Sequence, residues 1–398
     1  MGVSLPPQVS NILATLEGAG YEAFVVGGCV RDIIRGTQPT DWDITTSATP
    51  AQAKALFLRT VDTGIKHGTI TVLFDGQHFE VTTYRIDGKY LDNRRPQAVT
   101  FASNIEDDLS RRDFTMNAIA YNPRTGFMDP HGGIADINAR IIRSVGDAHL
   151  RFGEDALRML RAVRFCGTTG FTIHPNIICA ARALAGNLAY ISPERVREEL
   201  VKLVMSKNVA ALDHLLDTGL LSHVLQGYSF GGDIANIISW LAAAPPHEAM
   251  RMAILLHWAQ NDSEQMLRSM RFPLKFVREV TQYIKMLPTP IENNRYAIKK
   301  ALRSTTQGMF ANLISLKSII YPQDNLADIA ATAADIAQSG ECINLHMLAI
   351  NGNDIIATGI TDGAQVGEKL EMLLDLVLQN PNMNTREQLL HYSSCPQN

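Results

Sequence analysis

Cysteines are few in this sequence, and they are not arranged in pairs. Five occur among 398 residues, at the scattered positions Cys29, Cys166, Cys179, Cys342 and Cys395. Their spacing matches neither a disulfide framework nor a zinc-binding motif. We therefore expect reduced thiols and no structural metal.

Long apolar runs and a basic leader segment are missing as well. No stretch reaches the roughly 18 consecutive apolar residues that a membrane-spanning helix needs, and the first residues, MGVSLPPQVSNILATLEGAG, place no basic cluster before an apolar core. The hydrophobic content of 46% is ordinary for a globular protein. We expect a cytoplasmic protein that makes no use of membranes.

The sequence also lacks an excess of either charge. Its 36 Lys and Arg residues face 40 Asp and Glu residues, for a net charge of −4, which argues against a strongly basic, indiscriminate nucleic-acid binder. Residues 151–230 are an exception, because nine basic side chains there outnumber seven acidic ones. Any contact with RNA should therefore be local.

The chain is longer than a single ordinary core requires, and its pattern changes along its length. Strand signals dominate the first third, whereas residues from Asn138 onward show helical periodicity punctuated by prolines. We see no internal repeat, heptad pattern or low-complexity tract. The sequence predicts an α/β head followed by a long, all-helical remainder.

Two alternating carboxylates follow a glycine pair in the head. The run AFVVGG predicts a strand that ends in a tight turn at Gly27 and Gly28, with a helix beginning in VRDIIRG. If the later D-W-D segment is a strand, Asp41 and Asp43 project from the same face. Carboxylates that close repel unless a cation lies between them, and hard oxygen ligands suit Mg²⁺. A plain surface D-x-D is the alternative.

A hairpin is expected soon after this segment. The runs TITVLF and HFEVTTY flank Asp75-Gly76, a strong hairpin signal, and Thr49-Pro50 predicts a capped helix start. The hairpin's second arm carries Glu80. This side chain could approach the D-x-D pair as a third carboxylate, or it could simply face solvent.

Residues 151–165 are expected to form one helix with a charged face. At 100° per residue its apolar side consists of Ala156, Met159, Leu160 and Val163. The opposite side gathers four arginines and two acids, namely Arg151, Glu154, Asp155, Arg158, Arg161 and, at one edge, Arg164. An exposed helix with ordinary i,i+4 ion pairs would show the same pattern.

Nucleobase chemistry offers a second interpretation of this face. Cytosine and adenine both present an amino donor beside a ring-nitrogen acceptor, whereas uracil and guanine present the inverse order. Asp155 together with Arg158 could accept from the amino group and donate to the ring nitrogen. Such a pair would select C and A.

The segment RRDFTMN contains further candidates for nucleotide recognition. A ribose needs short polar groups for its hydroxyls and a triphosphate needs guanidinium groups. We assign Asp113 to the ribose 2′-OH, with Arg112 and Asn117 also at the nucleotide. In the alternative interpretation, Asp113 caps a helix and Asn117 forms a turn. A later charged helix start, with Arg195, Arg197, Glu198 and Glu199, is expected to brace the structure.

The combination of these motifs resembles a known family. G-G-x-V-R-D followed by D-x-D is similar to the nucleotidyltransferases related to DNA polymerase β, in the branch of tRNA nucleotidyltransferases and bacterial poly(A) polymerases. The likeness extends over nearly the whole chain through the motifs R-R-D and E-D-x-x-R and the tail segment LAINGNDII. Within this branch, the sequence is most similar to the bacterial-type (class II) CCA-adding group. The resemblance implies a polymerase-β-like head with a small mixed sheet, then an elongated helical neck, body and tail, at residues 1–137, 138–205, 206–290 and 291–398.

The resemblance also implies an activity: template-independent addition of C, C and A to the 3′ end of tRNA from CTP and ATP, with release of pyrophosphate. Mg²⁺ would be held by Asp41 and Asp43, with Glu80 as a third catalytic carboxylate. The helical parts would receive the acceptor stem and T-arm of tRNA, and a homodimer is left open.

Roles for individual residues follow from the same resemblance. Gly27, Gly28 and Arg31 would lie against the phosphates, and Asp155 with Arg158 would serve as a protein template. Glu154 would steer that pair, leaving Arg161 and Arg164 for phosphates or orientation. A loop at residues 87–96 would permit the final A addition through Asp92, Arg94 and Arg95.

Three rival functions remain at this stage. An enzyme that adds only A, or a poly(A) polymerase, would share the same motifs; a strongly basic C-terminal extension would favour the latter, and the tail is net negative. From a different class, the chain could be a catalytically silent RNA- or nucleotide-binding protein. The intact Asp41, Asp43, Asp155 and Arg158 argue against that last alternative.

Overall fold

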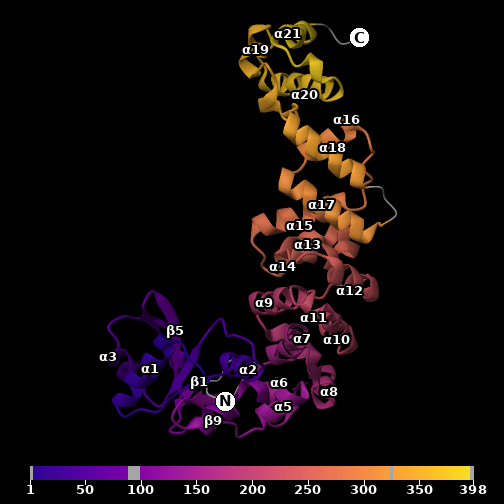
Figure 1. Ribbon diagram of the computed structural model, residues 1–398. Helices are drawn as coiled ribbons and strands as arrows, with labels where there is room; N and C mark the ends of the chain where they lie inside the picture. The colour runs from indigo at the N-terminus through magenta and orange to yellow at the C-terminus, as the bar shows by residue number, and fades with distance from the viewer. Residues whose placement is uncertain (1–2, 88–98, 323–325, 395–398) are drawn as a thin grey trace. The chain divides into compact units, whose positions relative to one another are not determined.

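The computed structural model describes residues 3–87, 99–322 and 326–394. The chain divides into two compact units. The first unit consists of Met1–Ala242 and Asn261–Val277, and the second of Ala243–Gln260 and Arg278–Asn398. An α/β head followed by a largely helical remainder, as expected, is confirmed (Figure 1). The finer division into head, neck, body and tail stays a prediction.

A seven-stranded mixed sheet organises the head. Its strand order is β3-β4-β5-β2-β1-β8-β9, and only the pair of β2 and β5 is parallel. The strands are β1 (Ala23–Val26), β2 (Asp43–Thr46), β3 (Thr60–Gly64), β4 (Thr69–Phe74), β5 (Gln77–Thr83), β8 (Ala120–Asn122) and β9 (Gly126–Met128). A separate small sheet joins β6 (Arg85–Asp87) to β7 (Val99–Phe101).

The turns of this sheet follow from local sequence. Asp75 and Gly76 both have positive φ, at 48° and 74°, as a two-residue type I′ hairpin between β4 and β5 requires. Thr49 caps α3 (Pro50–Leu56) in a reciprocal capping box with Gln52, and Pro50 is the first helical residue. The predicted hairpin and capped helix start are both confirmed.

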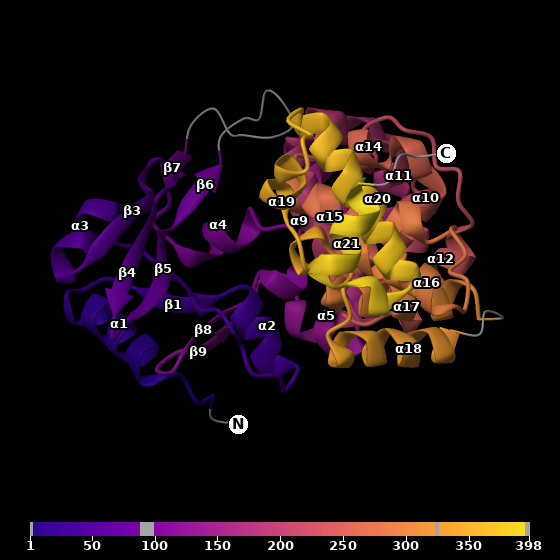
Figure 2. The ribbon, with the colours of Figure 1, turned by 90° about the horizontal axis from the view of Figure 1, so that it is seen from above.

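Helices cover the sheet and connect it to the helical part of the first unit. The helix α1 (Pro7–Gly18) packs on β1 and on α3, and Figure 2 shows both helices beside the sheet. A second helix, α2 (Gly28–Ile34), leaves β1 directly and contacts α5 (Gly133–Ala139). The helix α4 is Ile105–Ser110. The head also contains two short 3₁₀ turns, η1 (Ile65–His67) between β3 and β4 and η2 (Thr115–Asn117) after α4.

Helices dominate the rest of the first unit. A two-stranded parallel pair, β10 (Ile141–Ile142) and β11 (Thr172–Ile173), is the exception. The helical elements are α6 (Ala148–Glu154), α7 (Leu157–Thr169), α8 (Pro175–Leu184), η3 (Ala185–Tyr190), α9 (Pro193–Val204), η4 (Val209–Leu212), α10 (Asp213–Asp217), α11 (Leu220–Val224), α12 (Ile234–Ala243) and α14 (Ser263–Ser269).

The single helix predicted for residues 151–165 is wrong. The helix α6 ends at Glu154, Asp155 is extended with φ −139° and ψ 104°, and α7 begins at Leu157. The side chain of Asp155 accepts a hydrogen bond from the backbone N–H of Leu157 at 3.1 Å. A short acidic side chain that bonds to nearby backbone competes with helix continuation, so the chain turns here. The predicted apolar stripe of α7 is nonetheless buried, with Met159 and Leu160 fully inaccessible.

The second unit is helical and has cores of its own. One core joins helices α16 and α18 through residues such as Ile298 and Ile329, and another gathers the last helices around Leu373. Its elements are α13 (Glu248–Leu255), η5 (His257–Asp262), α15 (Leu274–Met286), α16 (Arg295–Arg303), α17 (Gln307–Ile320), α18 (Leu326–Ser339), η6 (Leu345–Met347), α19 (Gly352–Ala357), α20 (Gly363–Gln379), η7 (Pro381–Met383) and α21 (Arg386–Ser394). The boundary between the units falls within α15 and η5 and before the last residue of α12.

Prolines end several of these helices, as the sequence predicted. Pro245 follows α12, Pro288 follows α15 and Pro322 follows α17. None of the helices in the described ranges is both long enough and apolar enough to cross a membrane.

Candidate active site

A cleft beside strands β2 and β5 has three carboxylates among its lining residues. It measures about 950 Å³ and is lined by Thr40, Asp41, Trp42, Asp43, Thr63, Thr71, Gly76, Gln77, His78, Phe79 and Glu80. Asp43 begins β2, whereas Asp41 lies two residues ahead of that strand, so the expectation that both aspartates belong to the strand is wrong for Asp41. The parallel register of β2 and β5 places Asp43 beside Glu80.

The electrostatics of this cleft suit a cation. Burial raises the pKa of Asp43; Arg112 opposes the rise, and the neighbouring carboxylates of Glu80 and Asp41 add to it. A divalent ion would relieve this repulsion, and carboxylate oxygens are the ligands that hard cations prefer. Within the described ranges, no group of three or more His, Cys, Asp or Glu side chains is arranged so that it could hold a metal ion, so Glu80 is not placed as a third ligand beside Asp41 and Asp43. Two aspartates would therefore leave coordination positions for water and for substrate oxygens.

Gly27 allows the turn after β1 to approach this cleft closely. Its φ is +80°, which L-residues with a side chain rarely adopt. A Cβ atom at this position would lie 3.2 Å from Nη1 of Arg112 and 3.8 Å from Oδ2 of Asp43. The backbone conformation therefore favours glycine in the predicted phosphate turn, and a Cβ there would also require the Arg112 guanidinium to shift slightly.

Arg31, on α2, is held in place by two partners. Its guanidinium donates to both carboxylate oxygens of Asp32, at 3.0 and 3.1 Å, and to Oδ1 of Asn117 at 2.8 Å. The predicted phosphate-binding arginine is therefore fixed beside the R-R-D segment.

The R-R-D segment depends on a buried acid that sequence reasoning missed. Asp108 is fully buried on α4 and accepts from Arg111 at 2.7 Å and from Arg112 at 3.1 Å. Burial alone would raise the pKa of Asp108, but the two guanidinium groups outweigh it and the pKa is lowered. The i,i+3 and i,i+4 spacing of these residues was the available signal.

Asp113 is also buried, and three donors surround its carboxylate. Oδ1 accepts from the backbone N–H of Phe114 at 2.8 Å and from Nδ2 of Asn117 at 3.1 Å, while Oδ2 accepts from Nε of Arg161 at 2.8 Å. Burial would raise the pKa of Asp113, but Arg161 and Asn117 bring it down to about 2. Asn117 lies on the same side as Asp113, within the 3₁₀ turn η2 rather than an α-helix.

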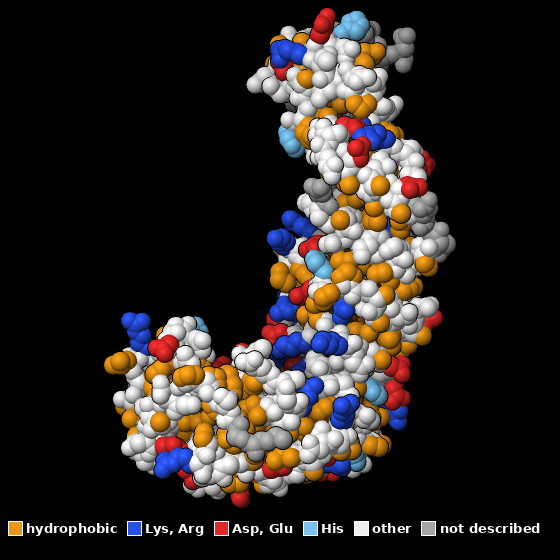
Figure 3. Space-filling view, viewed as in Figure 1, with side chains coloured by type: hydrophobic (Ala, Val, Ile, Leu, Met, Phe, Trp, Pro, Cys, Tyr) orange, Lys and Arg blue, Asp and Glu red, His pale blue; other side chains and the backbone are white. Residues whose placement is uncertain are grey.

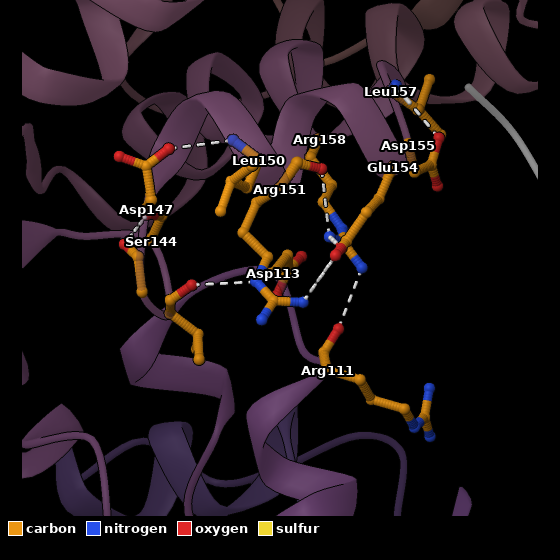
Figure 4. A network of polar contacts seen from close by, with 12 residues as sticks. Arg111, Asp113, Ser144, Asp147, Leu150, Arg151, Glu154, Asp155, Leu157 and Arg158 are labelled. Atoms are coloured by element: carbon orange, nitrogen blue, oxygen red, sulfur yellow. Dashed lines mark hydrogen bonds and ion pairs between the residues drawn. The ribbon is translucent and has the colours of Figure 1, made fainter. Parts of the chain in front are cut away.

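Glu154 joins two arginines beside the R-R-D segment. It accepts from Arg151 at 2.9 Å and from Arg158 at 2.6 Å. Arg158 also donates to the backbone carbonyls of Arg151, at 3.1 Å, and Arg111, at 2.9 Å (Figure 4). These contacts hold the Arg158 guanidinium, whose side chain is only 9% exposed.

Asp155 takes part in a different set of contacts. Its carboxylate turns toward Leu157 (Figure 4) and forms an ion pair with Arg195 of α9, with 2.8 Å between Oδ2 and Nη2. Asp155 and Arg158 are thus held by separate partners and do not share one face of a continuous helix, because the chain turns between them. The base-reading role of Asp155 together with Arg158 therefore stays a prediction.

Arg161 and Arg164 project from α7 toward a buried acid of α9. Glu199 is 4% exposed and accepts from Arg161 at 3.4 Å and from Arg164 at 2.7 Å. The guanidinium of Arg164 also lies 3.5 Å from the centroid of the Phe165 ring. In the space-filling view, Lys and Arg side chains gather over α7 and α9 (Figure 3). The bracing role expected for the start of α9 fits the contacts of Glu199.

Comparison with known proteins locates this architecture in a family. The model of the poly A polymerase head domain matches residues 23–143, the model described as a probable RNA and SrmB-binding site of polymerase A matches residues 170–230, and the model of tRNA nucleotidyltransferase domain 2 matches residues 247–392. The CCA-adding enzyme of Lactiplantibacillus plantarum is 37% identical over 395 residues, covering 96% of this chain and 94% of that protein. The chain belongs to the CCA-adding enzyme family.

Further relatives agree with this assignment to the tRNA nucleotidyltransferases. The CCA-adding enzyme of Geobacillus thermodenitrificans is 38% identical over 399 residues, covering 96% of both proteins. The crystal structure of the Bacillus stearothermophilus CCA-adding enzyme in complex with CTP superposes with a TM-score of 0.85 at 32% identity, covering 98% of this chain and 97% of that one. Membership of the CCA-adding family implies the use of a divalent metal ion.

One predicted feature of this CCA-adding family member cannot be placed. Asp92, Arg94 and Arg95, expected to act in the final A addition, lie outside the described residues.

Proposed function

We propose that this protein adds C, C and A in turn to the 3′ end of tRNA, using CTP and ATP and releasing pyrophosphate, without a nucleic-acid template. One observation carries the proposal. Asp43 lies beside Glu80 in the cleft, and the chain that places them there aligns over 96% of its length with enzymes named for CCA addition. We place this activity in the cytoplasm.

Mg²⁺ is the metal that the carboxylate set favours. We propose that Asp41 and Asp43 bind it and that Glu80 supports them as the third catalytic carboxylate, since all three line the same cleft. When bound, Mg²⁺ neutralises triphosphate charge and lowers the pKa of the attacking hydroxyl.

The protein's own residues orient the two substrates. The 3′ oxygen of the tRNA attacks the α-phosphorus of the nucleotide, a new P–O bond forms, and the bond to the departing pyrophosphate breaks. We propose that the backbone of Gly27 and Gly28 and the guanidinium groups of Arg31 and Arg112 hold the triphosphate; the short approach of Gly27 to Arg112 and the contact of Arg31 with Asn117 support this. Positioning and electrostatic stabilisation supply most of the catalysis in such transfers.

Base and sugar selection are assigned to the residues around α6 and α7. We propose that Asp155 accepts the amino group of C or A and that Arg158, steered by Glu154, donates to the ring nitrogen. Asp113, positioned by Arg161 and Asn117, would recognise the ribose 2′-OH. Arg164 remains with Arg161 as an orienting residue.

The helical parts would bind tRNA. We propose that the neck, body and tail, at residues 138–205, 206–290 and 291–398, receive the acceptor stem and T-arm through shape and backbone contacts, as A-form RNA recognition usually requires.

The proposal is tested by incubating the protein with Mg²⁺ and labelled CTP or ATP. Three tRNAs are compared, ending before the first C, after CC and after CCA. We expect completion of CCA on the first two, no extension of the third, and no incorporation by Asp41→Ala with Asp43→Ala. Transfer of A alone would indicate an A-adding enzyme, long A tails would indicate a poly(A) polymerase, and no incorporation would indicate a silent binding protein.

A further inference from the structure

Both carboxylate oxygens of Asp155 are bound by residues outside the base-reading pair. Oδ1 accepts from the backbone N–H of Leu157 at 3.1 Å. Arg195 donates from Nη2 to Oδ2 at 2.8 Å and from Nη1 to Oδ1 at 3.5 Å. The side chains of Asp155 and Arg195 are 17% and 34% exposed, so the pair is partly accessible rather than buried in the core.

Arg158 is fixed by contacts that do not involve Asp155. Its guanidinium is occupied by Glu154 and by the carbonyls of Arg151 and Arg111. Glu154 therefore orients the donor of the base-reading pair, and the acceptor needs an orienting partner of its own. Arg195, which lies 40 positions later in the sequence, contacts Asp155 and can supply that orientation.

We propose that Arg195 is a positioning residue for base selection. It aims the Asp155 carboxylate so that a remaining lone pair accepts the exocyclic amino group of CTP or ATP. This inference rests on the proposed function, because it assumes that Asp155 reads the base.

The geometry gives a physical reason for this role. An ionised carboxylate has about four lone-pair sites, so one N–H and one guanidinium leave acceptor capacity for a base. The backbone of Asp155 is extended and lies between the helices α6 and α7, so helical geometry does not set the direction of its side chain. The two-point contact with Arg195 supplies that direction in advance, which lowers the cost of ordering the acceptor when the nucleotide binds.

The test is Arg195→Met in single C addition to a tRNA that lacks CCA. Two nucleotides are compared: CTP and the triphosphate of the pyrimidin-2-one ribonucleoside, which lacks the exocyclic amino group. We expect the KM for CTP to rise about tenfold with kcat changed less than about twofold, while the KM for the analogue changes less than about twofold. An equal rise for both nucleotides would indicate a merely structural role and overturn the inference.

Two further arginine variants keep the test decisive. Arg197→Met removes a neighbouring arginine on α9 whose guanidinium contacts the Arg271 carbonyl instead of Asp155; we expect it to leave the KM for CTP unchanged. Arg195→Lys keeps the charge without the two-point contact and should give an intermediate KM for CTP. If Arg195→Met fails to fold, as judged by circular dichroism, the lysine variant carries the same comparison, and a wild-type ratio of CTP to analogue would overturn the inference.

Asp155→Ala separates this inference from the proposed function. Asp155→Ala could raise the KM for CTP but not for the analogue while Arg195→Met leaves the KM for CTP unchanged. In that case the positioning role of Arg195 is wrong and base reading by Asp155 stands. If Asp155→Ala leaves both KM values unchanged, base reading by Asp155 is itself wrong.

Discussion

Buried carboxylates with arginine partners surround the nucleotide-recognition segments. Asp108, Asp113 and Glu199 are each less than 10% exposed, and each accepts from at least one guanidinium. An unpaired charge at such depth would be costly, whereas a paired one fixes the side chains on both sides of the contact. Single residues here thus serve to hold others in position.

Asp113 should make the stability of the protein depend on pH. Its pKa of about 2 lies below the ordinary 3.8, so ionised Asp113 stabilises the folded state above about pH 4, and this contribution is lost as the pH falls toward 2. We expect Asp113→Asn to lower the free energy of unfolding by about 2 kcal/mol at pH 7. The difference from wild type should shrink as the pH falls below 4, as measured by urea denaturation.

The exposed Asp213 of α10 provides the control. We expect Asp213→Asn to change the free energy of unfolding by less than about 0.5 kcal/mol. A penalty for Asp113→Asn that stays constant down to pH 3 would contradict the assignment of the low pKa to this residue.

Gly27 is the residue at which backbone conformation and catalysis meet. Alanine there must adopt a positive φ at a cost of about 1–3 kcal/mol, and its Cβ would press on Arg112. We expect Gly27→Ala to lower kcat/KM for CTP at least about tenfold. Gly18→Ala is the matched control, since a Cβ at Gly18 meets no atom within 4 Å. Wild-type kinetics in Gly27→Ala would show that the turn tolerates displacement.

At the scale of elements, α9 supports α7 through charge and close packing. Glu199 reaches Arg161 and Arg164 across the helix interface. At Gly167 a Cβ would lie 2.7 Å from Oγ of Ser206, so the absence of a side chain lets α7 lie close to the end of α9. The position of Asp113 depends on this pairing, because Arg161 bonds to both acids.

Removing the charge of Glu199 should therefore loosen the pairing of α7 with α9. Glu199→Gln keeps the size of the side chain but leaves Arg164 without its counter-charge and Arg161 with Asp113 as its remaining acid. We expect the free energy of unfolding to fall by about 3 kcal/mol, measured by urea denaturation at pH 7. Glu198→Gln, at the exposed neighbouring position, should change it by less than about 0.5 kcal/mol. Equal effects of the two variants would contradict the buried role of Glu199.

At the scale of the whole molecule, the chain forms two compact units, and each has its own buried residues and ion pairs. In the second unit Lys299 is 1% exposed, lies 2.5 Å from Oε2 of Glu341 and donates to the carbonyl of Leu378. Lys299 and both of these partners lie within the second unit. Cooperative unfolding usually extends over one compact core, so the units should unfold as separate transitions.

Scanning calorimetry should resolve these two transitions. We expect Glu199→Gln to lower the midpoint of one and Lys299→Met, which leaves Glu341 without a buried partner, to lower the midpoint of the other, each by several degrees. Exposed Lys300 provides the control for the second unit, as Lys300→Met should leave both midpoints nearly unchanged. A single transition moved by both Glu199→Gln and Lys299→Met would show that the units unfold together.

Much of the head could be predicted from the sequence because its signals are local. The hairpin at Asp75-Gly76, the cap at Thr49 and the turn at Gly27 depend on residues a few positions apart, whose conformational preferences act without tertiary context. The family motifs added the catalytic candidates, whose roles remain predictions.

The pairing of distant charges was decided only by the tertiary structure. Asp155 bonds to Arg195 and Arg161 to Asp113 across 40 and 48 residues, and no periodicity in the sequence specifies such partners. The helix break at Asp155 has one local and one distant contribution: its carboxylate accepts from the backbone N–H of Leu157 two residues later, and it pairs with the distant Arg195, which the helical spacing of the apolar residues did not indicate. Sequence alone determined which chemical groups are present and the turns near them; folding determined which of those groups face one another, because contacts between remote segments form only when packing brings the segments together.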